Sequence, residues 1–343
     1  MRIGIPREVK DGEFRVALSP RATHGLQVIV EPGAGAGVGF TDEQYVEAGA
    51  RLGDPWECEL VVKVKELQES EHAKPRAGQI VFGFQHFGPH PELLDAALAS
   101  GATFIAFETV GQSTGLPILS PMSAIAGRLA VQMGAWCLLK QNGGSGVLLP
   151  GLDGVPPGRV VILGAGNVGS NALAVAHGIG ADVTVFAKSA TRFPDLKRQY
   201  PRARFSSEKP SVRDADLVIA GVLTPGQMSP KLITRAMLRE MRPGSAFVDV
   251  GIDQGGVAET SRPTSHSAPT YVEEGVVHYC VPNMPAACAR TASLALESAV
   301  LPFVKQLMTG TATGDLHTGI QVKAGKVTHE QLARDTGRAY SRL

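Results

Sequence analysis

The stretch Arg159-Val-Val-Ile-Leu163, followed by Gly164-Ala-Gly-Asn-Val-Gly169, decides the fold of this chain. Its first half is an aliphatic run typical of a buried strand, and its second half is a glycine-rich turn. A helical stretch then reaches His177, and a second strand is expected over Asp182-Val-Thr-Val-Phe186. The order strand, glycine turn, helix, strand is typical of a parallel α/β unit.

The glycine spacing of this turn is that of a dinucleotide-binding site. Gly164 permits the sharp turn, Gly166 lets backbone amides approach a pyrophosphate, and Gly169 lets the helix pack against the strand. The first residues of the helix, Asn167 and Val168, lie where the helix presents partial positive charge to phosphates. The alternative, a glycine turn without a ligand, is weakened by the strand before the turn and the helix after it. We therefore expect a bound dinucleotide.

The end of the second strand indicates which dinucleotide is preferred. An NAD site usually places an acid there that bonds the ribose 2′-hydroxyl, but Ala187 occupies that position. Lys188, Ser189 and Arg192 follow, and charge-assisted bonds from Lys and Arg suit a 2′-phosphate. We predict a preference for NADP(H), with NAD(H) as the second choice. The alternative is that these residues are solvated loop residues without such a role.

Short strands and helices alternate along the rest of the chain. The further strands expected are Arg2–Ile5, Val28–Val30, Leu60–Val64, Ile80–Phe84, Thr103–Phe107, Leu217–Ala220, Ala246–Val250 and Val276–Val281. The further helices expected are one opened by Thr41, then Pro91–Ser100, Ser123–Lys140 and Arg290–Leu307, the last kinked or split at Pro302. Strands spaced by helices imply parallel pairing.

These elements predict an α/β protein of two Rossmann-like domains, each a doubly wound parallel sheet. Long helices should join the domains, and the active site is expected in the cleft between them. The substrate and catalytic domain is expected to comprise residues 1–122 and 290–343, and the dinucleotide-binding domain residues 123–289.

Composition and charge exclude several classes of protein. The 343 residues are 43% hydrophobic and 19% charged, which suits two folded cores. The net charge of +1 argues against a general nucleic-acid binder or a polybasic membrane protein. The sequence has no apolar run of the roughly 18 residues that a membrane span needs, and its start is no signal peptide. The 4 cysteines are too scattered for a disulfide framework or zinc site, so we expect a cytoplasmic protein without a metal.

Many ordered segments resemble the alanine dehydrogenase family, a relative of the first domain of pyridine nucleotide transhydrogenase. These segments are Met1–Glu8, Glu13–Pro20, Val61–Glu66, Phe82–His86, Phe107–Val110, Pro121–Ser123, Ala126–Arg128, Val248–Gly256 and Pro282–Pro285. The resemblance implies NAD(P)-dependent, reversible oxidative deamination of a small L-amino acid, L-alanine giving pyruvate and ammonia. It also implies a homo-oligomer, a hexamer with a dimer as the alternative, while charge and hydropathy lead us to expect no nucleic-acid or membrane partner.

The resemblance implies the roles of four side chains. Arg15 would hold the substrate carboxylate with its guanidinium fork, and Lys65 would polarise the carbonyl or hold the carboxylate. His86 would pass protons, because imidazole titrates near neutrality. Asp253 would face the amino group or position the leaving water. Taken singly, each would be an ordinary surface, strand-end or turn residue; their joint match favours catalysis.

The resemblance also implies cofactor contacts outside the glycine turn. Ser123 would meet a phosphate or ribose, Val222 and Leu223 would lie beside the adenosine, and Asn283 and Met284 beside the nicotinamide. For Met284 the alternative is that it fills a gap in the core.

Two segments around His86 depart from the family pattern. Gly83-Phe-Gln85 stands where members usually have Thr or Tyr and Leu, and Phe87-Gly-Pro-His90 replaces Leu-Ala-Ala. A buried amide at Gln85 would change which substrate fits, with core packing as the alternative. An imine reductase, or a dehydrogenase of a larger or more polar amino acid, therefore stays open. So does a nucleotide-binding protein without turnover, although it would have no use for the four catalytic side chains.

Overall fold

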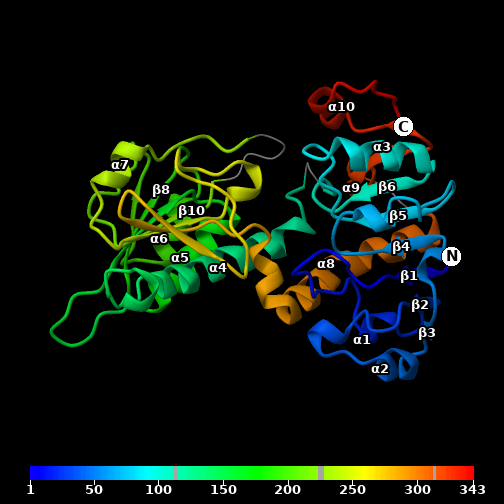
Figure 1. Ribbon diagram of the computed structural model, residues 1–343, viewed down its shortest axis with the longest axis horizontal. Helices are drawn as coiled ribbons and strands as arrows, with labels where there is room; N and C mark the ends of the chain where they lie inside the picture. Colours follow the sequence, from blue (N-terminus) through cyan, green and yellow to red (C-terminus); the bar gives the residue numbers. More distant parts are fainter. Residues whose placement is uncertain (112–113, 223–227, 312–313) are drawn as a thin grey trace. The chain divides into compact units, whose positions relative to one another are not determined.

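The computed structural model describes residues 1–111, 114–222, 228–311 and 314–343. The chain divides into two compact units, Met1–Met122 with Cys288–Leu343, and Ser123–Ala287. Each unit is built on one mostly parallel sheet (Figure 1). The predicted α/β class with two such sheets is confirmed.

The sheet of the first unit has eight strands in the order β15-β14-β6-β5-β4-β1-β2-β3. Their bounds are β1 (Ile3–Ile5), β2 (Val28–Val30), β3 (Arg51–Leu52), β4 (Leu60–Val62), β5 (Ile80–Gly83), β6 (Thr103–Ala106), β14 (Ile320–Lys323) and β15 (Lys326–Val327). Strands β1 to β6 pair in parallel, whereas β14 runs antiparallel to both β6 and β15. The C-terminal segment, red in Figure 1, thus completes the sheet beside β6 and adds an antiparallel edge that the sequence did not predict.

The first unit also contains six α-helices in its described residues, of which α8 is the longest. They are α1 (Pro20–Thr23), α2 (Asp42–Glu47), α3 (Pro91–Ser100), α8 (Ala289–Thr309), α9 (Asp315–Gly319) and α10 (Glu330–Thr336), with the 3₁₀ turns η1 (Ala36–Val38), η2 (Pro55–Glu57) and η3 (Glu69–Glu71). Thr41 opens α2 as predicted: its hydroxyl accepts the Gln44 N–H, and the Gln44 side chain accepts the Thr41 N–H.

Helix α8 bears on two expectations. It runs unbroken through Pro302, so the predicted split is wrong. Proline removes one N–H donor, and burial of a whole stripe of the helix outweighs that loss. The stripe comprises Ala292, Ser293, Leu296, Val300, Phe303, Val304 and Leu307.

The segment Met284–Thr309 is also long and apolar enough to cross a membrane by length and composition. A single such helix is weak evidence for a span, because helices of ordinary folded proteins meet the same criteria.

The sheet of the second unit has seven strands in the order β12-β13-β11-β10-β7-β8-β9. Their bounds are β7 (Arg159–Leu163), β8 (Asp182–Phe186), β9 (Arg204–Ser206), β10 (Leu217–Ala220), β11 (Ala246–Asp249), β12 (Thr270–Glu273) and β13 (Val276–Tyr279). The helices are α4 (Leu119–Cys137), which starts in the first unit, α5 (Asn167–Gly178), α6 (Phe193–Gln199) and α7 (Arg235–Arg239), with the 3₁₀ turns η4 (Lys140–Asn142), η5 (Ile252–Gln254) and η6 (Met284–Cys288). Only β12 pairs antiparallel among these strands of the described chain.

The topology of each sheet determines where a site can form. In the second unit, β7 lies between β10 and β8, and the glycine turn follows its carboxyl end at the point where the strand order reverses. Such a point is where open α/β sheets bind ligands. In the first unit, β4, β5 and β6 are parallel neighbours, so the segments that follow them emerge at one edge.

Candidate active site

The segments after β4 and β5 bring Lys65, Glu66 and His86 together. Glu66 Oε2 lies 3.0 Å from His86 Nδ1 and 3.2 Å from Lys65 Nζ. Lys10 pairs with the other carboxylate oxygen. The Glu66 side chain is 5% exposed. The predicted catalytic lysine and histidine therefore share one buried carboxylate.

Two lysines and a hydrogen bond from His86 keep this carboxylate ionised. Burial by itself raises the pKa of a carboxyl group. The hydrogen bond from His86 and the charges of Lys65, His86 and Lys10 outweigh burial and hold the pKa of Glu66 well below its usual range. An ionised carboxylate can only accept hydrogen bonds, so Nδ1 of His86 must be the donor. Nε2 is therefore the nitrogen that can take up a proton from a substrate.

The backbone of His86 is held in an unusual conformation. Its φ is +47°, in the left-handed region that residues other than glycine rarely adopt. The Glu108 carboxylate accepts the backbone N–H of His86 at 2.8 Å and that of Gln85 at 3.2 Å. The Phe84 ring stacks on the imidazole, with ring centroids 5.7 Å apart and planes inclined by 19°. Strain of this kind persists only where surrounding contacts over-determine it.

Arg15 is placed differently from the expectation. Its side chain is 1% exposed, and its Nε and Nη2 donate to the two carboxylate oxygens of Glu13 at 2.7 and 2.5 Å. Nη1 lies 3.3 Å from the Met122 sulfur. The expected bidentate grip on a substrate carboxylate is therefore not available at the Nε–Nη2 edge, because an internal carboxylate already fills it.

A second group of buried charges supports the segment that carries Lys65. Glu8 accepts the backbone N–H groups of Val64 and Lys65 at 2.5 and 3.3 Å. Lys63 Nζ lies 2.8 Å from Glu71 and 3.5 Å from Glu8. Burial raises the pKa of Glu8 to about 7, although the charge of Lys63 opposes this. Lys63 is thus an internal counter-ion, and Glu8 fixes the backbone from which Lys65 projects.

Gln85, next to His86, is packed inside the first unit. It is 1% exposed, and its Nε2 donates to the Gly83 carbonyl at 3.3 Å. Its Oε1 is one of the buried oxygens without a hydrogen-bond partner in the described part of the chain. Leaving such an acceptor unsatisfied costs about 1–3 kcal/mol. This departure from the family pattern therefore has an energetic consequence.

The glycine turn after β7 places its three glycines in three different environments. Gly164 has φ +101°, which favours glycine. A Cβ at Gly169 would lie 1.8 Å from the Gly164 carbonyl oxygen, so helix α5 packs on the turn only because that atom is missing. A Cβ at Gly166 would meet nothing within 4 Å. Neighbouring atoms therefore occupy the space where a Gly169 side chain would lie, whereas the corresponding space at Gly166 is empty.

Helix α5 begins without a side-chain cap. Gly166 is the N-cap and no side chain caps it. Asn167 is half-buried and accepts a hydrogen bond from Asn171 at 3.0 Å, and Val168 is buried. Helix α4 approaches closely here, because a Cβ at Gly127 would lie 2.2 Å from the Val168 carbonyl oxygen. Uncapped amides at a helix start beside open space suit a pyrophosphate.

The predicted 2′-phosphate residues follow β8 and are exposed. Lys188 and Ser189 extend into solvent, and the Ser189 hydroxyl bonds that of Thr191 at 2.7 Å. Arg192 reaches back to the glycine turn, where its Nη1 donates to the Ala165 carbonyl at 2.8 Å. One of the two predicted cations is therefore anchored at the turn itself.

The remaining predicted cofactor contacts have mixed environments. Ser123 on α4 is half-buried, as is Val222, whereas Leu223 lies outside the described residues. Asn283 adopts φ +54° and is half-buried. Met284 is 3% exposed, so its side chain offers a cofactor little surface and fills the core.

Asp253 belongs to the second unit, whereas the other three predicted catalytic residues belong to the first. It lies in η5, directly after β11, and is exposed. Its Oδ2 accepts the Asn283 backbone N–H at 3.5 Å. Two residues that the resemblance assigned to substrate and nicotinamide thus lie side by side.

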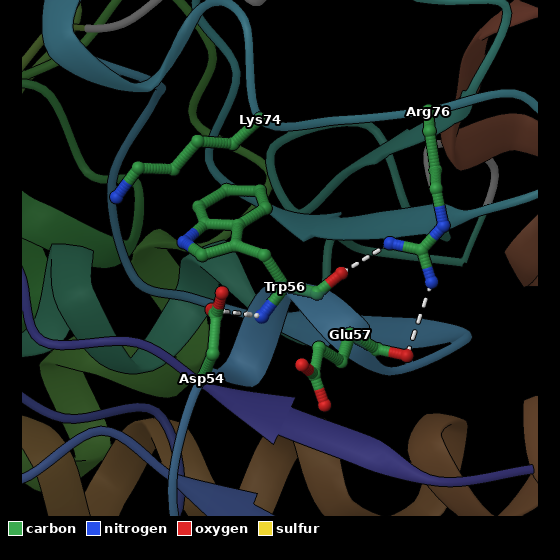
Figure 2. A pocket seen from close by; sticks show the side chains of 5 residues that line it. All are labelled: Asp54, Trp56, Glu57, Lys74 and Arg76. Atoms are coloured by element: carbon green, nitrogen blue, oxygen red, sulfur yellow. Dashed lines mark hydrogen bonds between the residues drawn. The ribbon is translucent and has the colours of Figure 1, made fainter.

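Two surface pockets occur in the first unit. One of about 380 Å³ lies beside the Glu66 cluster and is lined by Lys10, Glu66, Leu67, Gln68, Glu69, His72, His90, Glu92 and Leu93. The other, of about 310 Å³, contains no predicted site residue (Figure 2). Its Arg76 donates to the carbonyls of Trp56 and Glu57, so it is already engaged internally. Within the described ranges, no three His, Cys, Asp or Glu side chains gather as they would around a metal ion.

Sequence reasoning missed four carboxylates that shape this site. Glu8, Glu13, Glu66 and Glu108 all lie in segments that carry the family resemblance. The available signal was their position directly beside the predicted catalytic residues or in the same motifs. It could not show which cation each carboxylate contacts.

Comparison with known proteins identifies the family of this chain. The "Alanine dehydrogenase/PNT, N-terminal domain" family matches residues 4–126, and the "Alanine dehydrogenase/PNT, C-terminal domain" family matches residues 130–330. Alanine dehydrogenase of Halomonas elongata is 47% identical over 99% of this chain and 98% of that protein. The Bacillus subtilis enzyme is 43% identical over 99% and 96%. A solved L-alanine dehydrogenase structure has a TM-score of 0.93 at 42% identity, covering 98% of this chain and 99% of that one.

These matches extend over nearly the full length of the chain and of the relatives. They confirm the predicted family and, with it, the predicted class of amino acid dehydrogenase. The chain belongs to the alanine dehydrogenase/PNT family.

Proposed function

We propose that this chain catalyses the reversible reaction L-alanine + water + NAD(P)⁺ giving pyruvate + ammonium + NAD(P)H + H⁺. The observation that carries the proposal is the single buried carboxylate of Glu66, which contacts both Lys65 and His86. Oxidation of an amino acid needs a cation that binds the carboxylate and a side chain that carries protons. Glu66 holds one of each side by side. Relatives named alanine dehydrogenase, 40–47% identical over nearly their whole length, support the substrate.

The residues would divide the work as follows. Lys65 would bind the carboxylate or polarise the carbonyl of the oxo acid, and Nε2 of His86 would take up the proton released as the imine is hydrolysed. Arg15 would contribute its positive charge, and Asp253 would face the amino group. A bound nicotinamide dinucleotide supplies the hydride acceptor.

The dinucleotide site also supports a finer proposal, a preference for NADP(H). Ala187 stands where an acid would repel a 2′-phosphate, and Arg192 is anchored at the glycine turn. Because the cation is held there, less side-chain entropy is lost when it binds phosphate. Replacing Lys188 and Arg192 with Ala should weaken NADPH by roughly 10–100-fold and NADH hardly at all, as judged by kcat/KM with each cofactor. Equal losses with both cofactors would refute the preference.

The buried Oε1 of Gln85, which has no hydrogen-bond partner, favours a substrate that can donate a hydrogen bond to it. A larger or more polar amino acid, or an imine, could satisfy that buried acceptor if the segment rearranged on binding. A panel of small and polar L-amino acids with both cofactors tests both proposals. Highest kcat/KM with L-alanine supports the first proposal, and a clear preference for a polar side chain supports the alternative. No reduced cofactor with any amino acid or oxo acid would favour a nucleotide-binding protein without turnover.

The proposal also covers the oligomeric state of the protein and its compartment in the cell. We propose a homo-oligomer in the cytoplasm, a hexamer or a dimer, as the resemblance implies. Light scattering on the purified protein would give the subunit number, and a monomer at working concentrations would contradict the proposal.

A further inference from the structure

We propose that Glu66 is a positioning residue that fixes the ring of His86 and tunes the pH at which it works. This inference rests on the proposed function and deepens it. The Oε2 atom of Glu66 accepts a hydrogen bond from Nδ1 of the His86 imidazole at 3.0 Å, and the Phe84 ring stacks on the imidazole. Of the two ring nitrogens, only Nε2 is then oriented for proton transfer.

The electrostatics distinguish positioning from proton relay. A relay would need Glu66 to accept the proton of His86, but its cationic partners hold the pKa of Glu66 far below neutrality. Glu66 therefore stays negative throughout turnover. A fixed hydrogen-bond acceptor beside Nδ1 anchors the tautomer of the imidazole.

The charges around Glu66 come from several elements. Lys65 pairs with Oε2 and Lys10 with Oε1. The Lys63 ammonium donates to the Glu66 backbone carbonyl at 3.3 Å. The neighbouring pocket adds four further titratable groups, which are Glu69, His72, His90 and Glu92. The Glu108 carboxylate accepts the backbone N–H of His86 at 2.8 Å, whereas Glu66 is the carboxylate that pairs with the imidazole ring.

The decisive experiment is the pH profile of kcat/KM for L-alanine oxidation in Glu66→Gln. In this direction His86 acts as a base, so activity rises with pH as the imidazole loses its proton. An amide still accepts the Nδ1 hydrogen bond but carries no charge, so the midpoint should fall by roughly one unit or more. The value of kcat should fall by about 10–100-fold, with KM changing less.

A second variant should shift the midpoint of the pH profile in the opposite direction. Lys10 competes for the Glu66 charge and is 34% exposed. Lys10→Met should move the midpoint to higher pH, by less than the Glu66 variant moves it down, because solvent screens this pair. A purely structural role for Glu66 gives no reason for shifts of opposite sign.

Two matched controls separate tuning from general damage. Glu69→Gln removes a charge from the same pocket without contacting His86, and Glu71→Gln removes a buried carboxylate that pairs with Lys63. Both should leave the midpoint in place. Glu66→Asp keeps the charge but shortens its reach, so it should lower kcat while keeping the midpoint near that of the wild type.

A readout without substrate separates this inference from the proposed function. His86 is 38% exposed and accessible to diethyl pyrocarbonate, which acylates the neutral imidazole. The pH dependence of that reaction, followed by mass spectrometry of the His86 peptide, should shift in the same directions in the folded variants. An unchanged midpoint in both assays for Glu66→Gln would overturn the inference. A shift in acylation with no activity on any amino acid would instead refute only the proposed function.

Discussion

The two candidate sites of this protein are built in opposite ways. The site in the second unit consists of backbone: a turn open at Gly166, filled at Gly169, and followed by uncapped amides of α5. The site in the first unit consists of side chains, where Lys65 and His86 share the Glu66 carboxylate. A backbone site depends on residues that are neighbours in sequence, whereas a side-chain site depends on partners brought together by the sheet. The two should therefore fail differently when mutated.

The largest expected effect is the loss of turnover on replacing His86. His86→Ala should reduce kcat by about 10²–10⁴-fold, since general acid–base catalysis contributes that much. Dinucleotide affinity, measured by fluorescence titration, should stay within about twofold because the glycine turn is made elsewhere in the chain. Near-full activity would remove His86 from the mechanism.

Two glycine variants should break the backbone site in different ways. In Gly169→Ala the new Cβ would lie 1.8 Å from the Gly164 carbonyl oxygen, so the turn must move and the free energy of unfolding should fall by about 3 kcal/mol or more. In Gly166→Ala the Cβ meets nothing, so stability should change by less than about 1 kcal/mol while dinucleotide affinity falls. Urea unfolding and cofactor titration give both values. Similar destabilisation in the two variants would contradict this division.

The side-chain site should carry a pH-dependent cost of folding. The pKa of Glu8 is raised to about 7 in the folded protein, above the ordinary value of 4.5. Between these two pH values the folded state binds a proton that the unfolded state has released, so stability falls as pH rises and stays lower above pH 7. The difference should reach about 3 kcal/mol at most.

Glu8→Gln tests this cost directly. Because glutamine does not titrate, the decline in unfolding free energy from pH 5 to pH 7.5 should be smaller in the variant than in the wild type. Other titrating groups contribute equally to both proteins and cancel in the comparison. Parallel curves would show that Glu8 does not carry the dependence.

The smallest effect should come from Gln85. Gln85→Leu removes the buried amide whose oxygen lacks a partner and should raise the free energy of unfolding by about 1 kcal/mol. If Gln85 serves only the core, the relative kcat/KM values across the amino-acid panel should stay unchanged. A changed substrate order would instead make Gln85 a specificity residue.

The sequence predicted the backbone site better than the side-chain site. The GxGxxG turn, its flanking strand and its helix are local, and the central parallel strands follow from aliphatic runs. The antiparallel edges β12, β14 and β15 were missed, because short strands at an edge carry weak periodicity. The long helix α8 was predicted, but its continuation without a split at Pro302 was not, because burial of a stripe can outweigh the local effect of proline.

The partners of the catalytic side chains could not be read from the sequence. Arg15 pairs with Glu13 only two positions away, yet nothing in the sequence distinguishes that pair from a guanidinium awaiting substrate. The contact of Glu66 with His86 joins residues 20 apart through neighbouring strands. Such contacts follow from sheet register, which single-sequence patterns do not define.

The most direct test of the account follows the hydrogen on the α-carbon. The protein is incubated with L-alanine deuterated at that carbon and oxidised NADP or NAD, and the products are examined by mass spectrometry. The proposed reaction should give pyruvate, ammonium and reduced cofactor in equal amounts, with the deuterium on the nicotinamide ring. Absence of reduced cofactor, or deuterium lost to solvent while the cofactor is reduced, would contradict it.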